Sequence, residues 1–306
     1  MKKISRFDSK TIKNTILNDF PDFKIKTIKL IENGWDNVVA EINGQYIFRF
    51  LKDPGDSNYR GIGKDFNREI ELLDYLQDKI SVVIPKVEFI GKTLNYTGYK
   101  KISGMDLTKK VFYLLNKQKK EKLIFDLANF LREVHSSLSI NQARKMGFED
   151  EDPKSYSNMI KRILLKKIIS PDISDFVKET LKEYEIMVQK KAKLVFLYND
   201  LHTENMAFDY KTKKLNGIFD FSDAMIGDIN LDFSPLYKFD PYFMKAVVEK
   251  YQDLTGRKLN LRHMIIYERI NELCDLAEFI NKPSSKVYKQ VMMRIKKWKK
   301  EINIFK

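Results

Sequence analysis

The feature that most constrains the fold is a change in the spacing of apolar residues along the chain. Between about residues 24 and 50, apolar and polar side chains alternate, a period of two that is typical of half-buried strands. Asn43-Gly44 interrupts this stretch with a strong signal for a hairpin turn. From residue 105 onward the spacing becomes that of amphipathic helices. The sequence therefore predicts a sheet followed by a helical region.

The N-terminal part is predicted to form a five-stranded antiparallel sheet. Three strands cover the alternating stretch, and apolar runs at residues 82–85, 87–90 and 97–102 complete the sheet. A helix over residues 9–19, for which Ser9 is a possible cap, precedes the strands.

The rest of the chain is predicted to be mainly helical, which makes the fold class α+β. Residues 99–104 are interpreted as a hinge between a lobe of residues 1–102 and a larger lobe of residues 103–306. Helices are expected at residues 66–76, 120–136, 154–169, 172–190, 241–253, 261–281 and 284–302.

Three polar features of the helical part are expected to have structural roles. Residues 149–153 are interpreted as an acidic linker, and His135 ends a helix. Asp228 and Asp232 are expected to cap and orient the helix that follows them.

The residues best suited to chemistry lie between positions 195 and 222. Asp200 and Asn205 follow an apolar run, and Asp220 lies inside another one. Kinase catalytic loops have this D-x-x-x-x-N spacing, in which the Asp accepts the acceptor's hydroxyl proton while the Asn and a later Asp hold magnesium. The apolar runs 206–208 and 215–221 predict a hairpin that brings Asn205 and Asp220 together over a cleft. Each residue alone is equally typical of a turn.

Arg49 is predicted to bind nucleotide phosphates. It lies in the third strand, where kinases carry a cation that a helical Glu orients. Glu69, at the edge of the apolar stripe of the helix over residues 66–76, is the expected partner. Lys52 is the alternative cation if the strand is shifted in register, and an exposed strand position is the alternative role for Arg49.

Two backbone segments complete the predicted nucleotide site. Asn33-Gly34 lies in a turn whose N–H groups could fold over phosphates, although a plain hairpin turn is an equally good interpretation. In the hinge, backbone hydrogen bonds to a purine edge are expected from Tyr99, Lys100, Lys101 and Ile102.

Composition excludes several classes of protein. The net charge is +14, but the lysines are spread along helical faces and no nucleic-acid motif is present, so no nucleic-acid partner is expected. The single cysteine, Cys274, excludes an intrachain disulfide and fits a reducing compartment. No signal peptide and no apolar run long enough to cross a bilayer is visible, so a cytoplasmic protein without a membrane partner is expected.

Taken together, these stretches resemble the aminoglycoside phosphotransferases and their small-molecule kinase relatives, most closely the 2″-acting branch. The similarity extends over nearly the whole length. It is carried by residues 20–22, 46–50, 67–70, 126–135, 199–200, 217–224, 227–228 and 232–233.

The resemblance implies a bilobal protein-kinase-like fold and transfer of the γ-phosphoryl group of ATP or GTP to a hydroxyl of an aminoglycoside antibiotic, which confers resistance. It implies Asp200 as the catalytic base, Asn205 and Asp220 as Mg²⁺ ligands, and Arg49 with Glu69 as the phosphate pair.

Two positions depart from the family pattern. Tyr198 stands where a His usually precedes the catalytic Asp, and Ser222 takes the third position of the D-F-G-like motif. They motivate an alternative, a non-catalytic nucleotide-binding protein. A protein kinase is disfavoured because a G-x-G-x-x-G loop and an A-P-E segment are missing.

The acceptor is the least constrained part of the prediction. A cationic aminoglycoside needs carboxylates, and Glu268, Glu272 and Asp275 share one face of a predicted helix, with Asp240 as a further candidate. An ordinary solvated helix face is the alternative interpretation. Because few other acids surround residues 237–242, a choline-, homoserine- or methylthioribose-like acceptor stays open.

Overall fold

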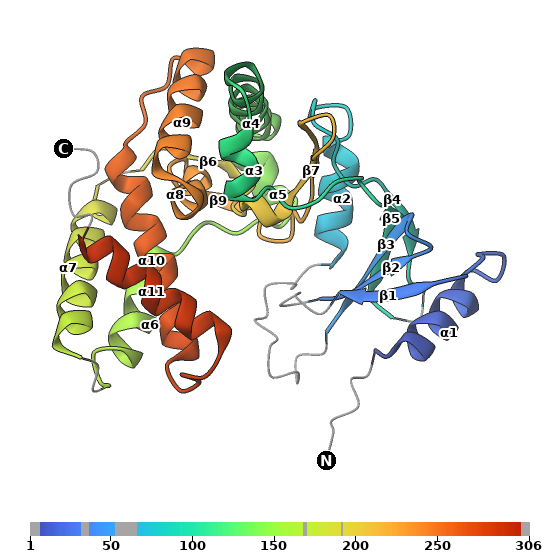
Figure 1. The fold of residues 1–306 in the computed structure, drawn as a ribbon, viewed down its shortest axis with the longest axis horizontal. Coiled ribbons are helices and arrows are strands. Elements are labelled where there is room, and N and C mark those ends of the chain that lie inside the picture. Colours follow the sequence, from blue (N-terminus) through green and yellow to red (C-terminus); the bar gives the residue numbers. More distant parts are fainter. Residues whose placement is uncertain are drawn as a thin grey trace. The chain divides into compact units, whose positions relative to one another are not determined.

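The computed structural model describes residues 7–31, 37–52, 66–92, 94–167, 170–190 and 192–300. The chain forms two compact units (Figure 1), one of Met1–Leu107 with Glu204–Asp223 and the other of Thr108–Thr203 with Ala224–Lys306. This grouping differs from the predicted lobes, because residues 204–223 return to the N-terminal unit. They are tied there by backbone bridges from Met105 to Phe208 and from Val83 to Gly217.

The first unit contains the predicted five-stranded sheet, which is antiparallel throughout and has the order β1-β2-β3-β5-β4. Its strands are β1 (Ile28–Ile31), β2 (Asn37–Ile42), β3 (Tyr46–Leu51), β4 (Val87–Ile90) and β5 (Tyr96–Lys100). Asn43 and Gly44 make the β2–β3 turn with positive φ angles of 56° and 67°, as this turn type requires. The strand expected at residues 82–85 is wrong, because Val83 pairs with Gly217 outside the sheet.

Helices α1 (Ser9–Asp19) and α2 (Phe66–Leu76) cover opposite faces of this sheet (Figure 1). Because side chains alternate along a strand, Phe48 and Phe50 of β3 point to the α1 face and Arg49 points to the α2 face. The α1 face forms an apolar cluster in which the rings of Phe50 and Tyr96 stack with centroids 4.6 Å apart. The N-cap of α1 is Asp8 rather than the predicted Ser9, since the Asp8 carboxylate accepts the N–H of Thr11.

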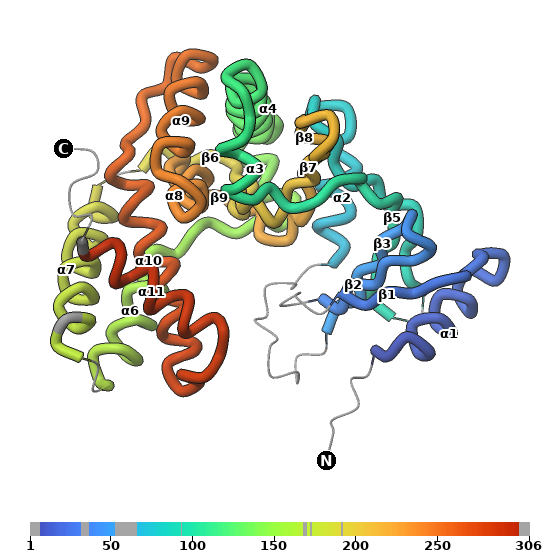
Figure 2. The backbone as a smooth tube through the Cα atoms, viewed as in Figure 1, coloured from blue at the N-terminus to red at the C-terminus, as the bar shows by residue number. Residues whose placement is uncertain are grey.

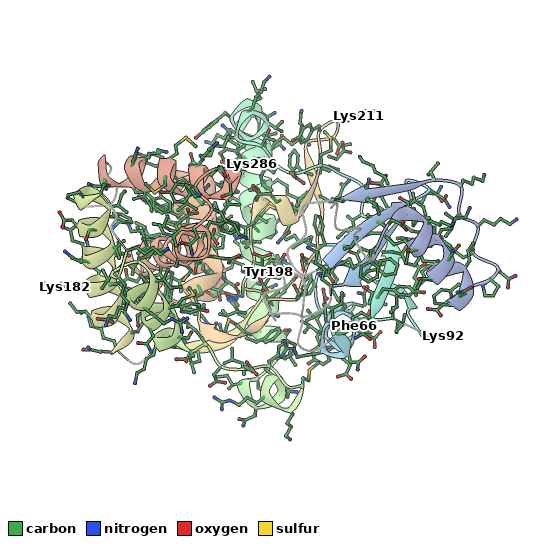
Figure 3. The ribbon with its side chains drawn as sticks, turned by 90° about the horizontal axis from the view of Figure 1, so that it is seen from below. Phe66, Lys92, Lys182, Tyr198, Lys211 and Lys286 are labelled. Carbon is green, nitrogen blue, oxygen red and sulfur yellow. The ribbon has the colours of Figure 1, made fainter. Side chains whose placement is uncertain are left out.

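The hairpin of β7 (Met206–Asp209) and β8 (Lys214–Ile218) also belongs to the first unit, and Figure 3 labels Lys211 at its tip. β8 ends at Ile218, three residues before the predicted end at Phe221, because the backbone of Asp220 turns to a φ of +67°. Gly104 lets the chain pass close to this hairpin: a Cβ there would lie 2.6 Å from the carbonyl carbon of Ala207.

The second unit is mainly helical, as predicted (Figure 2). Its elements are α3 (Lys109–Leu114), α4 (Lys117–Ser137), α5 (Ile140–Lys145), α6 (Pro153–Ile163), α7 (Pro171–Val188), β6 (Leu194–Leu197), β9 (Met225–Asp228), the 3-10 turn η2 (Leu231–Phe233), α8 (Ser234–Phe239), α9 (Pro241–Thr255), α10 (Leu261–Phe279) and α11 (Lys286–Lys300). Helix α10 packs against α6, α7, α8 and α11. No helix of the described ranges combines the length and apolarity that a bilayer crossing needs.

Strands β6 and β9 of the second unit pair antiparallel in a short two-stranded ribbon. Strand β9 was not predicted from the sequence. The acidic segment predicted as a linker runs alongside β9, since Glu151 donates its N–H to the carbonyl of Ile226 at 2.6 Å and Ile226 donates to Glu149 at 2.9 Å. β6 ends at Leu197, directly before Tyr198, so this ribbon fixes where the segment containing Asp200 begins.

Candidate functional site

The predicted functional residues divide between the two units. Asp200 belongs to the helical unit, whereas Arg49, Glu69, Asn205 and Asp220 belong to the sheet unit. A 3-10 turn, η1 (Thr203–Asn205), contains the point where the chain passes from one unit to the other.

In the sheet unit, Arg49 ion-pairs with two carboxylates. Its guanidinium lies 2.6 Å from Glu69 Oε1 and 2.7 Å from Asp220 Oδ1. β3 aims Arg49 at the α2 face, and Glu69 comes from the first turn of α2. Arg49 is only 7% exposed, so the interpretation as an exposed strand residue is wrong, and Arg49 is the cation that pairs with Glu69.

The charge of this cluster is set by burial and by the two acids. Burial disfavours the charged form of Arg49, but the negative charges of Asp220 and Glu69 outweigh this effect of burial. Together they raise the pKa of the guanidinium well above its usual value. Burial raises the pKa of Tyr99, whose ring lies beside Arg49, so this phenol stays neutral. One guanidinium therefore faces two carboxylates, which leaves a negative charge suited to a bound cation.

Asp220 adopts a backbone conformation that is uncommon for a non-glycine residue, with φ at +67°. Two contacts support it: Ser222 Oγ donates to Asp220 Oδ1 at 2.8 Å, and the N–H of Phe221 donates to Glu69 Oε1 at 3.3 Å. Ser222, the departure from the D-F-G-like pattern, thus supplies a hydroxyl that orients the Asp220 carboxylate. Backbone strain of this kind is typical of functional sites.

The β7–β8 hairpin brings Asn205 beside the segment that carries Asp220, as predicted. The N–H of Phe219 donates to the carbonyl of Asn205 at 3.1 Å. An amide oxygen and a carboxylate suit Mg²⁺, which prefers oxygen ligands and usually retains waters and phosphate oxygens. Among the described residues no group of three or more His, Cys, Asp or Glu could hold a metal, and a site completed by phosphate needs fewer protein ligands.

In the helical unit, the segment before Asp200 is held through its backbone. Tyr198 is fully buried (labelled in Figure 3), and its ring packs edge-on against Phe130 with centroids 5.3 Å apart. The N–H of Tyr198 donates to Asp232 Oδ2 at 3.0 Å, and the N–H of Asn199 donates to Asp232 Oδ1. Asn199 has a φ of +65°, so the chain turns sharply just before Asp200.

Asp232 is the residue that the sequence analysis misjudged most. It makes no cap of the next helix, because its side chain is completely buried between the Tyr198–Asn199 backbone and His135. His135 Nε2 lies 2.8 Å from Asp232 Oδ2, and its Nδ1 lies 2.8 Å from the hydroxyl of Tyr251. The structural role expected for His135 is confirmed. An acid directly between the apolar residues Leu231 and Phe233 was the available signal for Asp232.

His202 is a second residue that the sequence analysis missed. Its ring nitrogen Nε2 lies 3.3 Å from Asp200 Oδ1, and its backbone N–H donates to the backbone carbonyl of Asp200 at 2.7 Å. The Asp200 side chain is 23% exposed, which leaves it accessible to a hydroxyl group. The signal was an imidazole two positions after the predicted base.

The acids predicted to bind the acceptor lie in the helical unit, and most are buried. Glu268 and Glu272 of α10 are each 1% exposed, so the solvated-face interpretation is wrong for both; Asp275 is half-buried. Asp240 caps α9 by accepting the N–H of Phe243 at 2.8 Å, and it also accepts the hydroxyl of Tyr113.

The segments predicted to bind the nucleotide base are only partly described. Asn33 and Gly34 lie outside the described residues. Tyr99 and Lys100 end β5 and pair with β3, and the N–H of Lys101 already donates to the carbonyl of Gln45 at 2.7 Å. The Lys101 N–H is therefore not available to a purine, whereas the roles of Tyr99, Lys100 and Ile102 stay predictions.

Comparison with known proteins places the chain in a family. A sequence model of the phosphotransferase enzyme family matches residues 27–261. The structure is similar to a complex of APH(2″)-IIIa with GDP and kanamycin, with a TM-score of 0.82 and 21% identity over 95% of this chain and 98% of that one. It is also similar to a ternary complex of APH(2″)-IIa with streptomycin and ATP (TM-score 0.69, 19% identity, 95% and 96% covered). A type I macrolide 2′-phosphotransferase shares the fold as well (TM-score 0.68, 14% identity, 94% and 98% covered).

Proposed function

Because this chain belongs to the phosphotransferase enzyme family, we propose that it transfers the γ-phosphoryl group of ATP or GTP to a hydroxyl of an aminoglycoside, and so confers resistance to the antibiotic. The observation that carries the proposal is the Arg49–Glu69–Asp220 cluster, with Asn205 held beside the Asp220 segment. In kinases a strand cation that pairs with a helical Glu contacts the nucleotide phosphates, and Arg49 with Glu69 has this arrangement.

Asp200 is the proposed catalytic base. Its carboxylate accepts the proton of the acceptor hydroxyl as that oxygen attacks the γ-phosphorus, the bond to the bridging oxygen breaks, and the nucleoside diphosphate leaves. His202, 3.3 Å away, limits the positions that the carboxylate can adopt. The hydrogen bonds from Tyr198 and Asn199 to Asp232 fix the backbone that carries Asp200.

Arg49 is proposed to contact the α- and β-phosphates through guanidinium N–H groups that do not bond Glu69 or Asp220, with Glu69 holding the side chain in place. Asn205 and Asp220 would hold Mg²⁺, which when bound neutralises charge on the phosphates. Tyr99, Lys100 and Ile102, with Asn33 and Gly34, are the proposed contacts to the rest of the nucleotide. Asp240, Glu268, Glu272 and Asp275 are the proposed acids on the acceptor side.

Of the structural relatives named above, one contains GDP and another contains ATP, which supports a nucleoside triphosphate donor without choosing the base. Their second ligands, kanamycin and streptomycin, make aminoglycosides the first acceptors to test.

The test is a phosphoryl-transfer assay with Mg-ATP and Mg-GTP against kanamycin, streptomycin, other aminoglycosides and smaller hydroxylated amines. We expect nucleoside diphosphate release that depends on acceptor, and a product heavier by one phosphoryl group. Asp200→Asn should lower the rate by roughly 10²–10⁴-fold, the usual contribution of a general base. Asp253→Asn, the same change at an exposed ion pair of α9, serves as control. Full activity of Asp200→Asn would refute the assignment, and nucleotide binding without any product would favour the non-catalytic alternative.

A further inference from the structure

We propose that Glu151 makes the β6–β9 ribbon sensitive to pH: its carboxyl group packs against β9 while it holds a proton, and its ionisation loosens the ribbon and the segment that leads from β6 to Asp200. This effect belongs to the fold of the second unit and does not depend on which acceptor or nucleotide the protein uses. Its structural basis is the stretch 149–151, which was predicted to be part of a linker and instead pairs with β9.

The Glu151 side chain lies directly on the strand with which its backbone pairs. Its Oε2 accepts the N–H of Asp228 at 3.4 Å, which is a long and therefore weak hydrogen bond. Gly227 allows this close approach, since a Cβ there would lie 3.3 Å from the same oxygen. The other oxygen, Oε1, is buried and has no hydrogen-bond partner within the described part of the chain. An ionised carboxylate in this position is unfavourable, because its hydrogen bonds do not replace those that water would supply.

No positive charge compensates the Glu151 carboxylate among the described residues. The charges that act on it are those of two other acids, Asp228 of β9 and the neighbouring Asp152. Two buried phenols complete its surroundings, Tyr184 of α7 and Tyr267 of α10. Ionisation of Glu151 therefore places a second negative charge beside Asp228 in a site without a cation.

The two phenols add a further polar group that lacks a partner. The hydroxyl of Tyr184 is buried and bonds to no group of the described ranges, whereas Tyr267 donates its hydroxyl to Asp228 Oδ2 at 3.3 Å. The rings of Tyr184 and Tyr267 meet edge-on with centroids 5.9 Å apart. Burial, and after it the charge of Glu151, raises the pKa of both phenols, so both stay neutral. A proton on Glu151 removes its charge from this cluster and gives the carboxyl group a hydrogen-bond donor.

The proton of Glu151 is lost within the physiological pH range. Burial, with the charges of Asp228 and Asp152, raises the pKa of Glu151 from 4.5 to about 7. A Glu151 that has left β9 for water has its ordinary pKa, so the attached form binds the proton more tightly than the detached form. Detachment therefore becomes easier by roughly tenfold per pH unit as pH rises between these two values, and the effect levels off above pH 7.

Backbone pairing connects Glu151 to the segment that carries Asp200. Ile226 of β9 uses both of its backbone groups on the stretch 149–151, donating to Glu149 and accepting from Glu151, while β9 as a whole pairs with β6. Detachment of the stretch leaves β9 bonded to β6 alone. Leu197 ends β6 opposite Met225, and the next residue, Tyr198, donates its N–H to Asp232. A looser ribbon thus loosens the anchor from which the Asp200 segment begins.

The experiment follows hydrogen exchange of backbone amides by NMR in the full-length protein between pH 5.5 and pH 7.5, with rates corrected for intrinsic exchange. In the wild type we expect the protection of the Glu151 and Ile226 amides to fall at least about tenfold over this range, and that of the Tyr198 amide to fall with it. Glu151→Gln keeps the side-chain shape without an ionisable group, so protection of these amides should change less than about twofold. Glu249→Gln, the same change in an exposed pair on α9, should behave as the wild type.

Two results would overturn the inference: wild-type protection at Glu151 and Ile226 that does not depend on pH, or protection that falls equally in Glu151→Gln. A fall at these two amides that leaves Tyr198 unchanged would overturn the link to the Asp200 segment. If Glu151→Gln does not fold, the wild-type series alone decides whether protection depends on pH. Because exchange is measured without turnover, a protein that shows the effect but phosphorylates nothing would refute the proposed function alone.

Discussion

Replacing Arg49 by Met would remove the cation at the centre of the proposed phosphate site while keeping a side chain that fills β3. Arg49 is 8% exposed at its side chain, and its partners Glu69 and Asp220 are 19% and 36% exposed. Removing one member of a buried ion pair typically destabilises a protein by about 3–5 kcal/mol. Because water can solvate Asp220 once the guanidinium is gone, we expect the lower end, about 3 kcal/mol.

Two further variants separate charge from geometry at this position. Arg49→Lys keeps the positive charge but cannot contact Glu69 and Asp220 with separate nitrogens of one planar group, so a loss of about 1–2 kcal/mol is expected. Arg262→Met removes the arginine of an exposed pair with Glu183, and should change stability by less than about 1 kcal/mol. The assay is urea unfolding, followed in parallel by calorimetric titration with Mg-ATP and Mg-GTP.

From most to least stable, the expected order is wild type, Arg262→Met, Arg49→Lys and Arg49→Met. Nucleotide affinity should fall at least about tenfold in Arg49→Met, since a charge-assisted contact contributes roughly 1.5–3 kcal/mol. If Arg49→Met unfolds at the same urea concentration as wild type, the buried ion pair does not stabilise the sheet unit. If it binds nucleotide as tightly as wild type, Arg49 has no role at the phosphates.

Two other predictions concern acids of the helical unit, the buried Asp232 and the half-buried Glu151. Asp232→Asn replaces one carboxylate oxygen by an NH₂ group that faces the backbone N–H of Tyr198 or Asn199. The variant should therefore be less stable by about 1–3 kcal/mol, and its kcat should fall more than its KM rises. Urea unfolding measures the stability and steady-state kinetics measure kcat and KM; an unchanged kcat would contradict the role given to Asp232. Burial raises the pKa of Glu151 from 4.5 to about 7, so between these pH values the folded protein holds a proton that the unfolded chain has lost, and stability falls as pH rises. Glu151→Gln should therefore be up to about 3 kcal/mol more stable than wild type above pH 7 and equal to it near pH 4, as urea unfolding across pH would show; parallel pH profiles would refute this reasoning.

The parts of the fold that local patterns encode could be predicted from the sequence. The alternation in β2 and β3 and the Asn43-Gly44 turn specify a hairpin within a few residues, so the sheet was predictable. The placement of Glu69 on the inner edge of α2 followed from helical spacing, and the D-x-x-x-x-N pattern selected Asp200 and Asn205 as candidates.

The contacts that sequence reasoning missed join residues far apart in the chain. Arg49 and Asp220 are 171 positions apart, and Asp232 reaches the Asn199 backbone from 33 positions away. No periodicity records such pairs, because they depend on which elements pack together. The acids of α10 were correctly placed on one face, yet only the packing of α8 and α11 reveals that Lys238 and Arg294 cover it.

The central claim is that Asn205 and Asp220 bind the metal of a nucleoside triphosphate whose phosphates contact Arg49. A crystal structure of the protein with Mg²⁺ and a non-hydrolysable triphosphate analogue tests it directly. The account predicts a metal ion about 2.1 Å from oxygen atoms of Asn205 and Asp220, bridged to phosphate oxygens that accept from the Arg49 guanidinium. A bound nucleotide whose metal and phosphates contact neither Asp220 nor Arg49 would contradict it.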